Sequence, residues 1–131
     1  MPDHPNVERT RARLEAFMKG DVETLASMIA EDAVWHIPGK NRFSGDFLGR
    51  DAIMGRFREM AEAGMRASIE DIHDIVGNDE HVVALVTLGA ETAGGSFRSR
   101  SVHVYHVRGE QAIKFWGYNQ DQDEIDAFFG S

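Results

Sequence analysis

The sequence predicts an α+β domain in which three N-terminal helices pack on a mainly antiparallel sheet. Two observations favour this fold class. Up to Gly64 most apolar residues recur at helical spacing, and beyond it β-branched segments alternate with turn signals. The 131 residues are enough for one domain with a substantial core, so we expect a single domain over residues 1–131.

The three helices are each marked by an apolar stripe and a stop signal. The first stripe comprises Val7, Leu14, Phe17 and Met18, and Gly20 ends that helix. Asp21 is the expected N-cap of the second helix, which carries Val22, Leu25, Met28 and Ile29. The third helix begins near Asp51, carries Ile53, Phe57, Met60 and Ala61, and closes at Gly64.

Between the second and third helices, residues 33–37 ("AVWHI") read as a short strand that ends at Pro38-Gly39. The following segment, residues 39–49 ("GKNRFSGDFLG"), is polar and rich in glycine. We therefore expect a loop there.

Four strands in a meander are predicted from residue 67 to residue 119. In "ASIEDIHDIV" isoleucines recur every three residues, which fits a strand that contains a bulge. "HVVALVTLGAET", "SFRSRSVHVYHV" and "AIKFWGYN" follow, separated by turns, and "DEIDAFFG" predicts a short terminal helix. Long strands that curl around helices leave an apolar cavity, the usual kind of site for a small molecule.

Composition argues against several functional classes. A net charge of −8 disfavours a nucleic-acid surface, and no apolar stretch reaches the roughly 20 residues of a membrane span. The chain has no cysteine, and its first ten residues lack the apolar core of a signal peptide, so we expect a soluble, cytoplasmic protein. The six histidines have no metal-ligand spacing and no phosphate-binding loop is present, so we expect neither metal nor cofactor.

Three segments, "FMKGDVETLASMIAEDAVWHIPG", "FLGRDAIMGRF" and "VHVYHVRGEQAIKFWGYNQD", resemble the nuclear transport factor 2-like superfamily, specifically its SnoaL-like and ketosteroid-isomerase-like branch. The resemblance runs from about Val7 to Phe129. It implies a cone-shaped α+β roll with a curved sheet, a conical pocket and a homodimer packed through the sheet. It does not imply one activity, since this fold carries both enzymes and binding proteins.

The catalytic positions of the ketosteroid isomerases are changed in this chain. Alignment on Ala33 and Pro38 places Ile37 where those enzymes have their general base, and isoleucine cannot accept a proton. The tyrosine that donates to the oxyanion falls near Arg13, and the second donor falls at His103. We therefore do not expect steroid isomerase chemistry by that mechanism.

His103 and Asp121 are the candidate catalytic residues. An imidazole in an apolar pocket can act as acid, base or neutral donor. The resemblance to SnoaL-like polyketide cyclases suggests Asp121 as its acid/base companion. The alternatives remain open: His103 as a core histidine with one internal hydrogen bond, and Asp121 or Asp123 as an ordinary N-cap of the terminal helix.

The predicted substrate-binding residues are Trp35, Ile37, Phe57, Tyr105 and Trp116. Trp35 and Ile37 share a strand face, and His36 points to the other, so His36 is expected outside the pocket. Trp116 and Tyr118 share one face of the last strand and Phe115 the other. Alternation alone does not say which face meets the pocket, although we place Trp116 there.

The leading functional hypothesis is a cofactor-independent isomerase, cyclase or lyase that acts by proton transfer on a small apolar cyclic or polyketide-like molecule. The alternative is a non-catalytic carrier or sensor of the same fold, and a protein-docking adaptor is less favoured. The surroundings of His103 discriminate between the first two. An acidic or hydroxyl partner favours chemistry, and purely apolar walls favour binding alone.

Overall fold

The computed structural model describes residues 3–130 and contains one six-stranded sheet and four helices among them. The elements in chain order are α1 (Pro5–Lys19), α2 (Val22–Ser27), β1 (Ile29–Ile37), β2 (Gly45–Leu48), α3 (Arg50–Glu62), β3 (Arg66–Gly77), β4 (His81–Thr92), β5 (Gly95–Arg108), β6 (Gln111–Asn119) and α4 (Gln122–Phe129). Within the described residues no helix is both long and apolar enough to cross a membrane.

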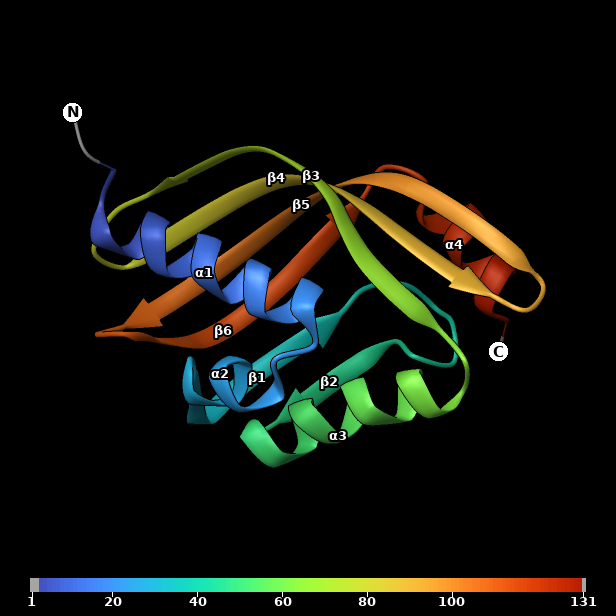
Figure 1. Ribbon diagram of the computed structural model, residues 1–131, viewed down its shortest axis with the longest axis horizontal. Helices are drawn as coiled ribbons and strands as arrows, with labels where there is room; N and C mark the ends of the chain where they lie inside the picture. Colours follow the sequence, from blue (N-terminus) through green and yellow to red (C-terminus); the bar gives the residue numbers. More distant parts are fainter. Residues whose placement is uncertain (1–2, 131) are drawn as a thin grey trace.

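The strands lie in the order β2-β1-β6-β5-β4-β3, and every neighbouring pair is antiparallel except β1 and β6, which are parallel. Helix α1 packs against β3 and β4, and α3 packs against β1 and β2, so the helices cover one face of the sheet (Figure 1). The predicted fold class, helices on a curved and mainly antiparallel sheet, is therefore confirmed. We call the helix-covered side the inner face and the opposite side the outer face.

Helix α1 begins and ends where its sequence signals indicate. His4 Nδ1 accepts a hydrogen bond from the Asn6 backbone N–H at 3.0 Å, and Pro5 occupies the first turn, where its missing N–H costs nothing. Gly20 takes a left-handed conformation with φ of 69°, which permits the Asp21 N–H to reach the Ala16 carbonyl at 2.9 Å.

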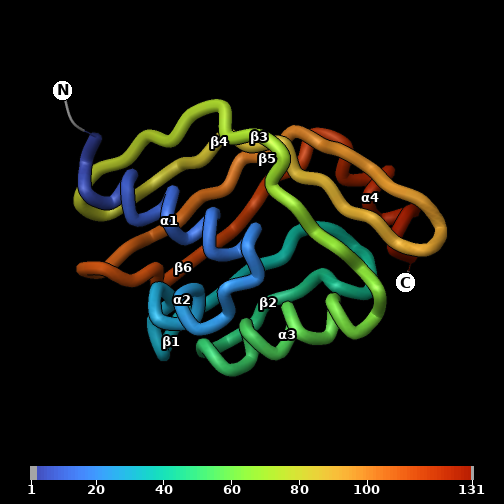
Figure 2. The backbone as a smooth tube through the Cα atoms, viewed as in Figure 1, coloured from blue at the N-terminus to red at the C-terminus, as the bar shows by residue number. Residues whose placement is uncertain are grey.

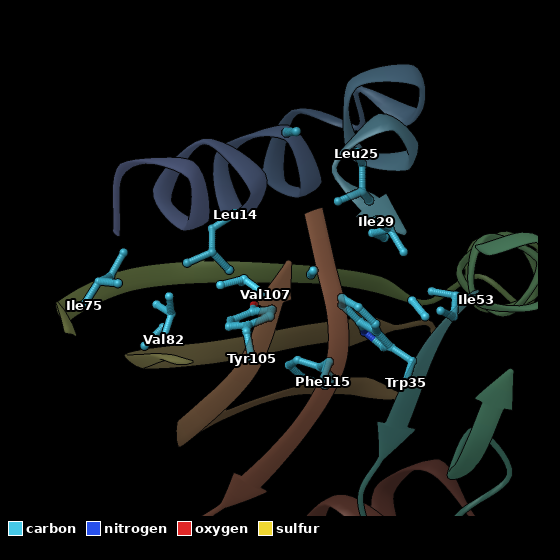
Figure 3. Close-up of a cluster of buried hydrophobic side chains, with 14 of the residues drawn as sticks. Leu14, Leu25, Ile29, Trp35, Ile53, Ile75, Val82, Tyr105, Val107 and Phe115 are labelled. Atoms are coloured by element: carbon cyan, nitrogen blue, oxygen red, sulfur yellow. The ribbon is translucent and has the colours of Figure 1, made fainter. Parts of the chain in front are cut away.

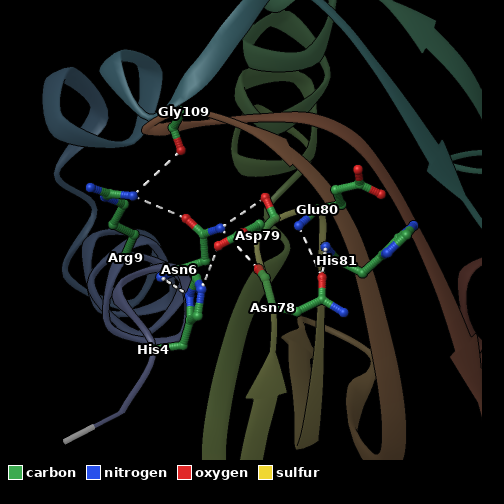
Figure 4. A network of polar contacts seen from close by, with 8 residues as sticks. All are labelled: His4, Asn6, Arg9, Asn78, Asp79, Glu80, His81 and Gly109. Atoms are coloured by element: carbon green, nitrogen blue, oxygen red, sulfur yellow. Dashed lines mark hydrogen bonds and ion pairs between the residues drawn. The ribbon is translucent and has the colours of Figure 1, made fainter.

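The start of α1 is fixed to the turn between β3 and β4 (Figure 4). The Asn6 side-chain amide donates to the carbonyls of Asn78 and Asp79 at 3.0 and 3.3 Å, and His4 Nε2 lies 2.8 Å from Asp79 Oδ1. The Asn78 side chain closes the turn by accepting the N–H groups of Glu80 and His81. These contacts set where the rest of α1 lies above the sheet.

Strand β3 contains the irregularity that its isoleucine spacing predicts. The β3–β4 register shifts twice, between Ile69 and Asp71 and between Ile72 and Asp74. Because each shift changes which face the following residues meet, Ile69, Ile72 and Ile75 all pack against the core despite their spacing of three. Figure 2 shows how β3 runs from the end of α3 to the start of α1.

The prediction of a loop over residues 39–49 is wrong in its second half. Strand β2 forms there and pairs with β1 from Val34↔Leu48 to Ile37↔Gly45. This edge strand has four residues and a charged one among them, so it lacks the apolar alternation that signals a strand. Strand β1 also begins earlier than predicted, at Ile29.

The inner face carries three aromatic rings from adjacent strands, with Leu14 of α1 above them (Figure 3). Trp35 of β1 stacks on Phe115 of β6 with ring centroids 4.9 Å apart, and Tyr105 of β5 meets Trp35 edge-on at 6.1 Å. All three rings are buried. They form the centre of the main hydrophobic core.

The predicted terminal helix forms as α4 and packs on the loop between β1 and β2. Phe129 contacts Phe43 edge-on at a centroid distance of 5.2 Å, within a second, smaller apolar cluster. Asp126 Oδ1 accepts hydrogen bonds from Asn41 Nδ2 at 2.8 Å and from Gln122 Nε2 at 2.9 Å. The fit is close at Gly39, where a Cβ would overlap the side chains of Gln122 and Asp126.

Replacement of Gly39 by alanine is therefore expected to destabilise the protein more than the same change at Gly20. Both glycines have positive φ, 98° and 69°, but no atom lies within 4 Å of a Cβ at Gly20. Gly20→Ala costs only the left-handed backbone term, about 1 kcal/mol. Gly39→Ala adds about 1 kcal/mol, because the ends of Gln122 and Asp126 must move aside and give up their hydrogen bonds with each other and with Asn41. Urea denaturation of both variants measures the difference. Equal losses would show that α4 does not sit tightly on this loop.

Candidate functional site

A cavity of about 170 Å³ lies between the inner face of the sheet and the helices. Its wall is almost entirely apolar and includes side chains of α1, α3 and α4 as well as the sheet. Five of the predicted site residues line it: Trp35, Ile37, Phe57, His103 and Tyr105. The cavity therefore lies where strand alternation and the resemblance had placed a pocket.

Trp116 does not line the cavity, and the prediction that it does is wrong. Residues on β6 alternate between faces, and Phe115 and Gly117 are the ones that point inward. Trp116 pairs with Val104 on the outer face, and its ring lies 5.0 Å from that of His106. Phe115 takes the place that was assigned to Trp116.

His36 lies outside the cavity, as predicted. Its Nδ1 is 2.5 Å from Asp46 Oδ1 of the edge strand β2, and half of its side chain is exposed. The conspicuous histidine of "AVWHI" thus belongs to the sheet edge.

Asp121 is absent from the cavity lining and occupies the N-cap position of α4. Its side chain makes no capping hydrogen bond, and its backbone N–H donates to Ser99 Oγ at 3.3 Å. The proposed pairing of Asp121 with His103 in one cavity is therefore not formed, and the alternative assignment to a helix terminus describes its position.

His103 is buried on the inner face between two small cross-strand neighbours, Ala84 on β4 and Gly117 on β6. Its ring meets Phe115 edge-on at 5.1 Å, and Nδ1 has no hydrogen-bond partner among the described residues. Burial lowers the pKa of His103 from 6.5 to about 4. The imidazole is therefore neutral near pH 7.

Arg13 of α1 also lines the cavity and is only 3% exposed. Its Nη2 donates to Thr10 Oγ1 at 2.9 Å, and its Cζ lies 4.7 Å from the centroid of the Tyr105 ring. Burial lowers the pKa of the guanidinium from its ordinary value, and nearby Tyr105 opposes that shift. Burial raises the pKa of Tyr105, so its hydroxyl stays protonated.

The sequence indicated Arg13 only through the family resemblance, which placed it near the tyrosine of the ketosteroid isomerases, and its place in the cavity wall was not predicted. A direct signal was present in the spacing Thr10, Arg13, Phe17, which continues along the apolar face of α1. A charged residue at such spacing indicates a buried cation that needs explanation.

The remaining polar wall lies beside α4. Asn41, Asn119 and Gln122 line the cavity there. Asn119 Nδ2 donates to Gln122 Oε1 at 2.8 Å, and its Oδ1 accepts from Ser101 Oγ, which lies outside the lining. No aspartate or glutamate is among the described residues of the lining. Within residues 3–130 no group of three or more histidine, cysteine or acidic side chains could hold a metal ion.

The burial of His103 predicts a pH-dependent stability. As pH falls below about 6.5, the unfolded state takes up the proton before the folded state does, so the free energy of unfolding falls until about pH 4. The loss from this group reaches about 3 kcal/mol. Urea denaturation across this range is expected to show a shallower profile for His103→Gln than for the wild type.

The matched control is His73→Gln, which replaces a histidine whose side chain is 42% exposed. This variant is expected to keep the wild-type slope. Parallel profiles for the wild type and His103→Gln would contradict burial of His103 in its neutral form.

The sequence model of the SnoaL-like domain family matches residues 10–115. The chain is 26% identical over 132 residues to an uncharacterized protein of Mycobacterium tuberculosis, covering 98% of this chain and 99% of that protein.

Two of the solved structures that share this fold serve as examples. One is a protein of unknown function with a cystatin-like fold from Xanthomonas campestris, with a TM-score of 0.90, 22% identity and coverage of 98% of this chain and 100% of that one. The other is TerC co-crystallized with polyporic acid, with a TM-score of 0.82, 22% identity and coverage of 98% and 100%.

Proposed function

The chain belongs to the SnoaL-like domain family, and we propose that its cavity binds one small, mainly apolar cyclic molecule. The observation that carries this proposal is the wall itself: aromatic and aliphatic side chains surround a few polar groups, with no carboxylate in the described lining. Cavities of this composition favour flat apolar rings, and the isolated polar groups fix their orientation.

The size of the cavity limits the ligand. Its volume of about 170 Å³ is close to the roughly 150 Å³ of an apolar cavity that takes up benzene. A molecule of one or two rings fits this space. TerC, which was crystallized with polyporic acid, supports the view that the fold accommodates cyclic compounds.

Binding without chemistry is favoured over proton transfer by the surroundings of His103. The ring contacts Phe115 and Gly117, its Nδ1 has no partner in the described residues, and Asp121 lies elsewhere. A general base is usually oriented and tuned by a second polar group. Within residues 3–130 no such group is hydrogen-bonded to His103.

Proton transfer of the isomerase, cyclase or lyase type is the second candidate function. It is favoured by one observation, the presence of a neutral imidazole and the Tyr105 hydroxyl on the same wall. The first is a potential base and the second a potential donor to a developing oxyanion.

The test is to identify by native mass spectrometry the molecule that co-purifies with the protein, and then to measure its affinity and turnover. His103→Ala is expected to weaken binding about tenfold or less, with little loss of stability, because no hydrogen-bonded partner is left unpaired. His36→Ala is the control and is expected to bind as the wild type does.

Turnover of the ligand that disappears in His103→Ala would favour the enzyme over the carrier. Loss of binding in His36→Ala with full binding in His103→Ala would contradict the assignment of the cavity as the site.

We further propose that the protein forms a homodimer through the outer face of the sheet. An apolar patch at its centre comprises Val83, Leu85, Val102, Val104, Trp116 and Tyr118, which lie on adjacent strands β4, β5 and β6. Leu85 and Tyr118 are 41% and 61% exposed. Exposed apolar patches mark interaction surfaces, and most homo-oligomers pair the same patch of both subunits around a two-fold axis.

Sedimentation at micromolar concentration is expected to show a dimer, and Leu85→Lys is expected to shift it to monomer because a charge would be buried at the contact. Val22→Lys provides the control, since Val22 is equally apolar and 60% exposed but lies on α2. A wild-type monomer, or dissociation by both variants, would contradict this interface.

A further inference from the structure

Arg13 is a buried cation without an anionic partner. Its side chain makes no ion pair with any described residue. Its described contacts are the Thr10 hydroxyl and the Tyr105 side chain, whose ring face lies beneath the guanidinium and whose hydroxyl is a hydrogen-bond partner. The Nε atom is buried and makes no hydrogen bond within the described residues. A guanidinium has five N–H donors, so the contacts with Thr10 and Tyr105 leave donors free for a ligand.

Such an arrangement is costly unless something outside the fold compensates. A charge withdrawn from water needs a counter-ion or a full set of hydrogen bonds, and Arg13 has two neutral hydroxyl partners but no counter-ion among the described residues, which favours binding of an anion. The cavity wall supplies no carboxylate among the described residues, and His103 on the same wall is neutral. The chain has 22 acidic residues and a net charge of −8, yet none of its described carboxylates pairs with Arg13.

We propose that Arg13 binds the anionic oxygen of the ligand, so that the cavity selects small cyclic organic acids over their neutral analogues. This inference rests on the proposed function, since it specifies the chemical class of the molecule that the cavity takes. A carboxylate or enolate oxygen placed beside Arg13 receives its free N–H groups, and the apolar ring lies against the aromatic wall.

A purely structural role for Arg13 makes different predictions. Its stacking on Tyr105 is a cation–π contact, which contributes to packing whether or not a ligand binds. In that case Arg13→Met weakens the fold. If the charge instead awaits an anion, Arg13→Met leaves the ligand-free protein as stable as the wild type or more stable, because an unpaired buried charge has been removed.

The experiment compares matched acid and amide probes: benzoate with benzamide, and 2-naphthoate with 2-naphthamide. Calorimetric titration of the wild type near neutral pH is expected to give at least about tenfold tighter binding for the acid of at least one pair. Arg13→Met is expected to remove that preference while retaining affinity for the amide. Arg13→Lys keeps the charge without the planar fork and is expected to keep part of the preference.

Arg11→Met is the matched control, since it removes the same charge from the same helix at a residue outside the cavity lining. It is expected to keep the full preference for the acids. The wild-type comparison of acid and amide needs no variant, so it decides the question even if Arg13→Met fails to fold.

Equal binding of acid and amide by the wild type overturns this inference and leaves cavity binding intact. So does a folded Arg13→Met that still prefers the acids, whatever its stability. Failure of all four probes to bind overturns the proposed function, and this inference with it.

Discussion

Three aromatic side chains, Trp35, Tyr105 and Phe115, join the strands β1, β5 and β6 on the inner face, and the arrangement of the site depends on them. Trp35 and Phe115 are register partners across β1 and β6, the parallel pair of the sheet, and their rings stack. Each buried ring contributes about 2–3 kcal/mol through its apolar area. The β1–β6 ladder shifts register before this point, so the stacked pair stabilises the pairing where it resumes.

The same rings form the floor of the cavity, and α1 lies above them. The position of α1 is set at its start by the hydrogen bonds of Asn6 to the β3–β4 turn. Two turns later in the helix, Arg13 is thereby placed over the face of Tyr105. The cavity thus lies between α1, which is attached to the β3–β4 turn, and the aromatic inner face of the sheet. Residues of α4 form part of its wall.

Much of the fold could be predicted because its signals are local. Helical stripes, the glycine at position 20 and the isoleucine spacing of β3 each reflect a single element and its nearest neighbours. The short edge strand β2 could not be predicted, because its pairing depends on β1 and only Phe47 among its residues is an apolar side chain turned toward the core.

The site was predicted less completely, for a related reason. Alternation along a strand divides side chains between two faces but does not say which face is covered. On β6 both faces carry an aromatic residue, Phe115 and Trp116, so the distinction rests on the neighbouring strands. Asp121 lies two residues beyond the end of β6, yet whether its side chain enters the cavity depends on where α4 starts, which is a tertiary feature.

The two buried basic side chains of the cavity respond to burial in opposite ways, so one is neutral and the other is charged. His103 loses its proton, because burial brings its pKa to about 4, and it then requires no counter-ion. Arginine does not take this route, because a guanidinium stays protonated in proteins. Arg13 therefore keeps its charge inside an apolar cavity, with the Thr10 hydroxyl and the Tyr105 side chain as compensation. An apolar side chain at this position avoids the cost of burying a charge, so the retained guanidinium supports the proposal that an anion from solution binds there.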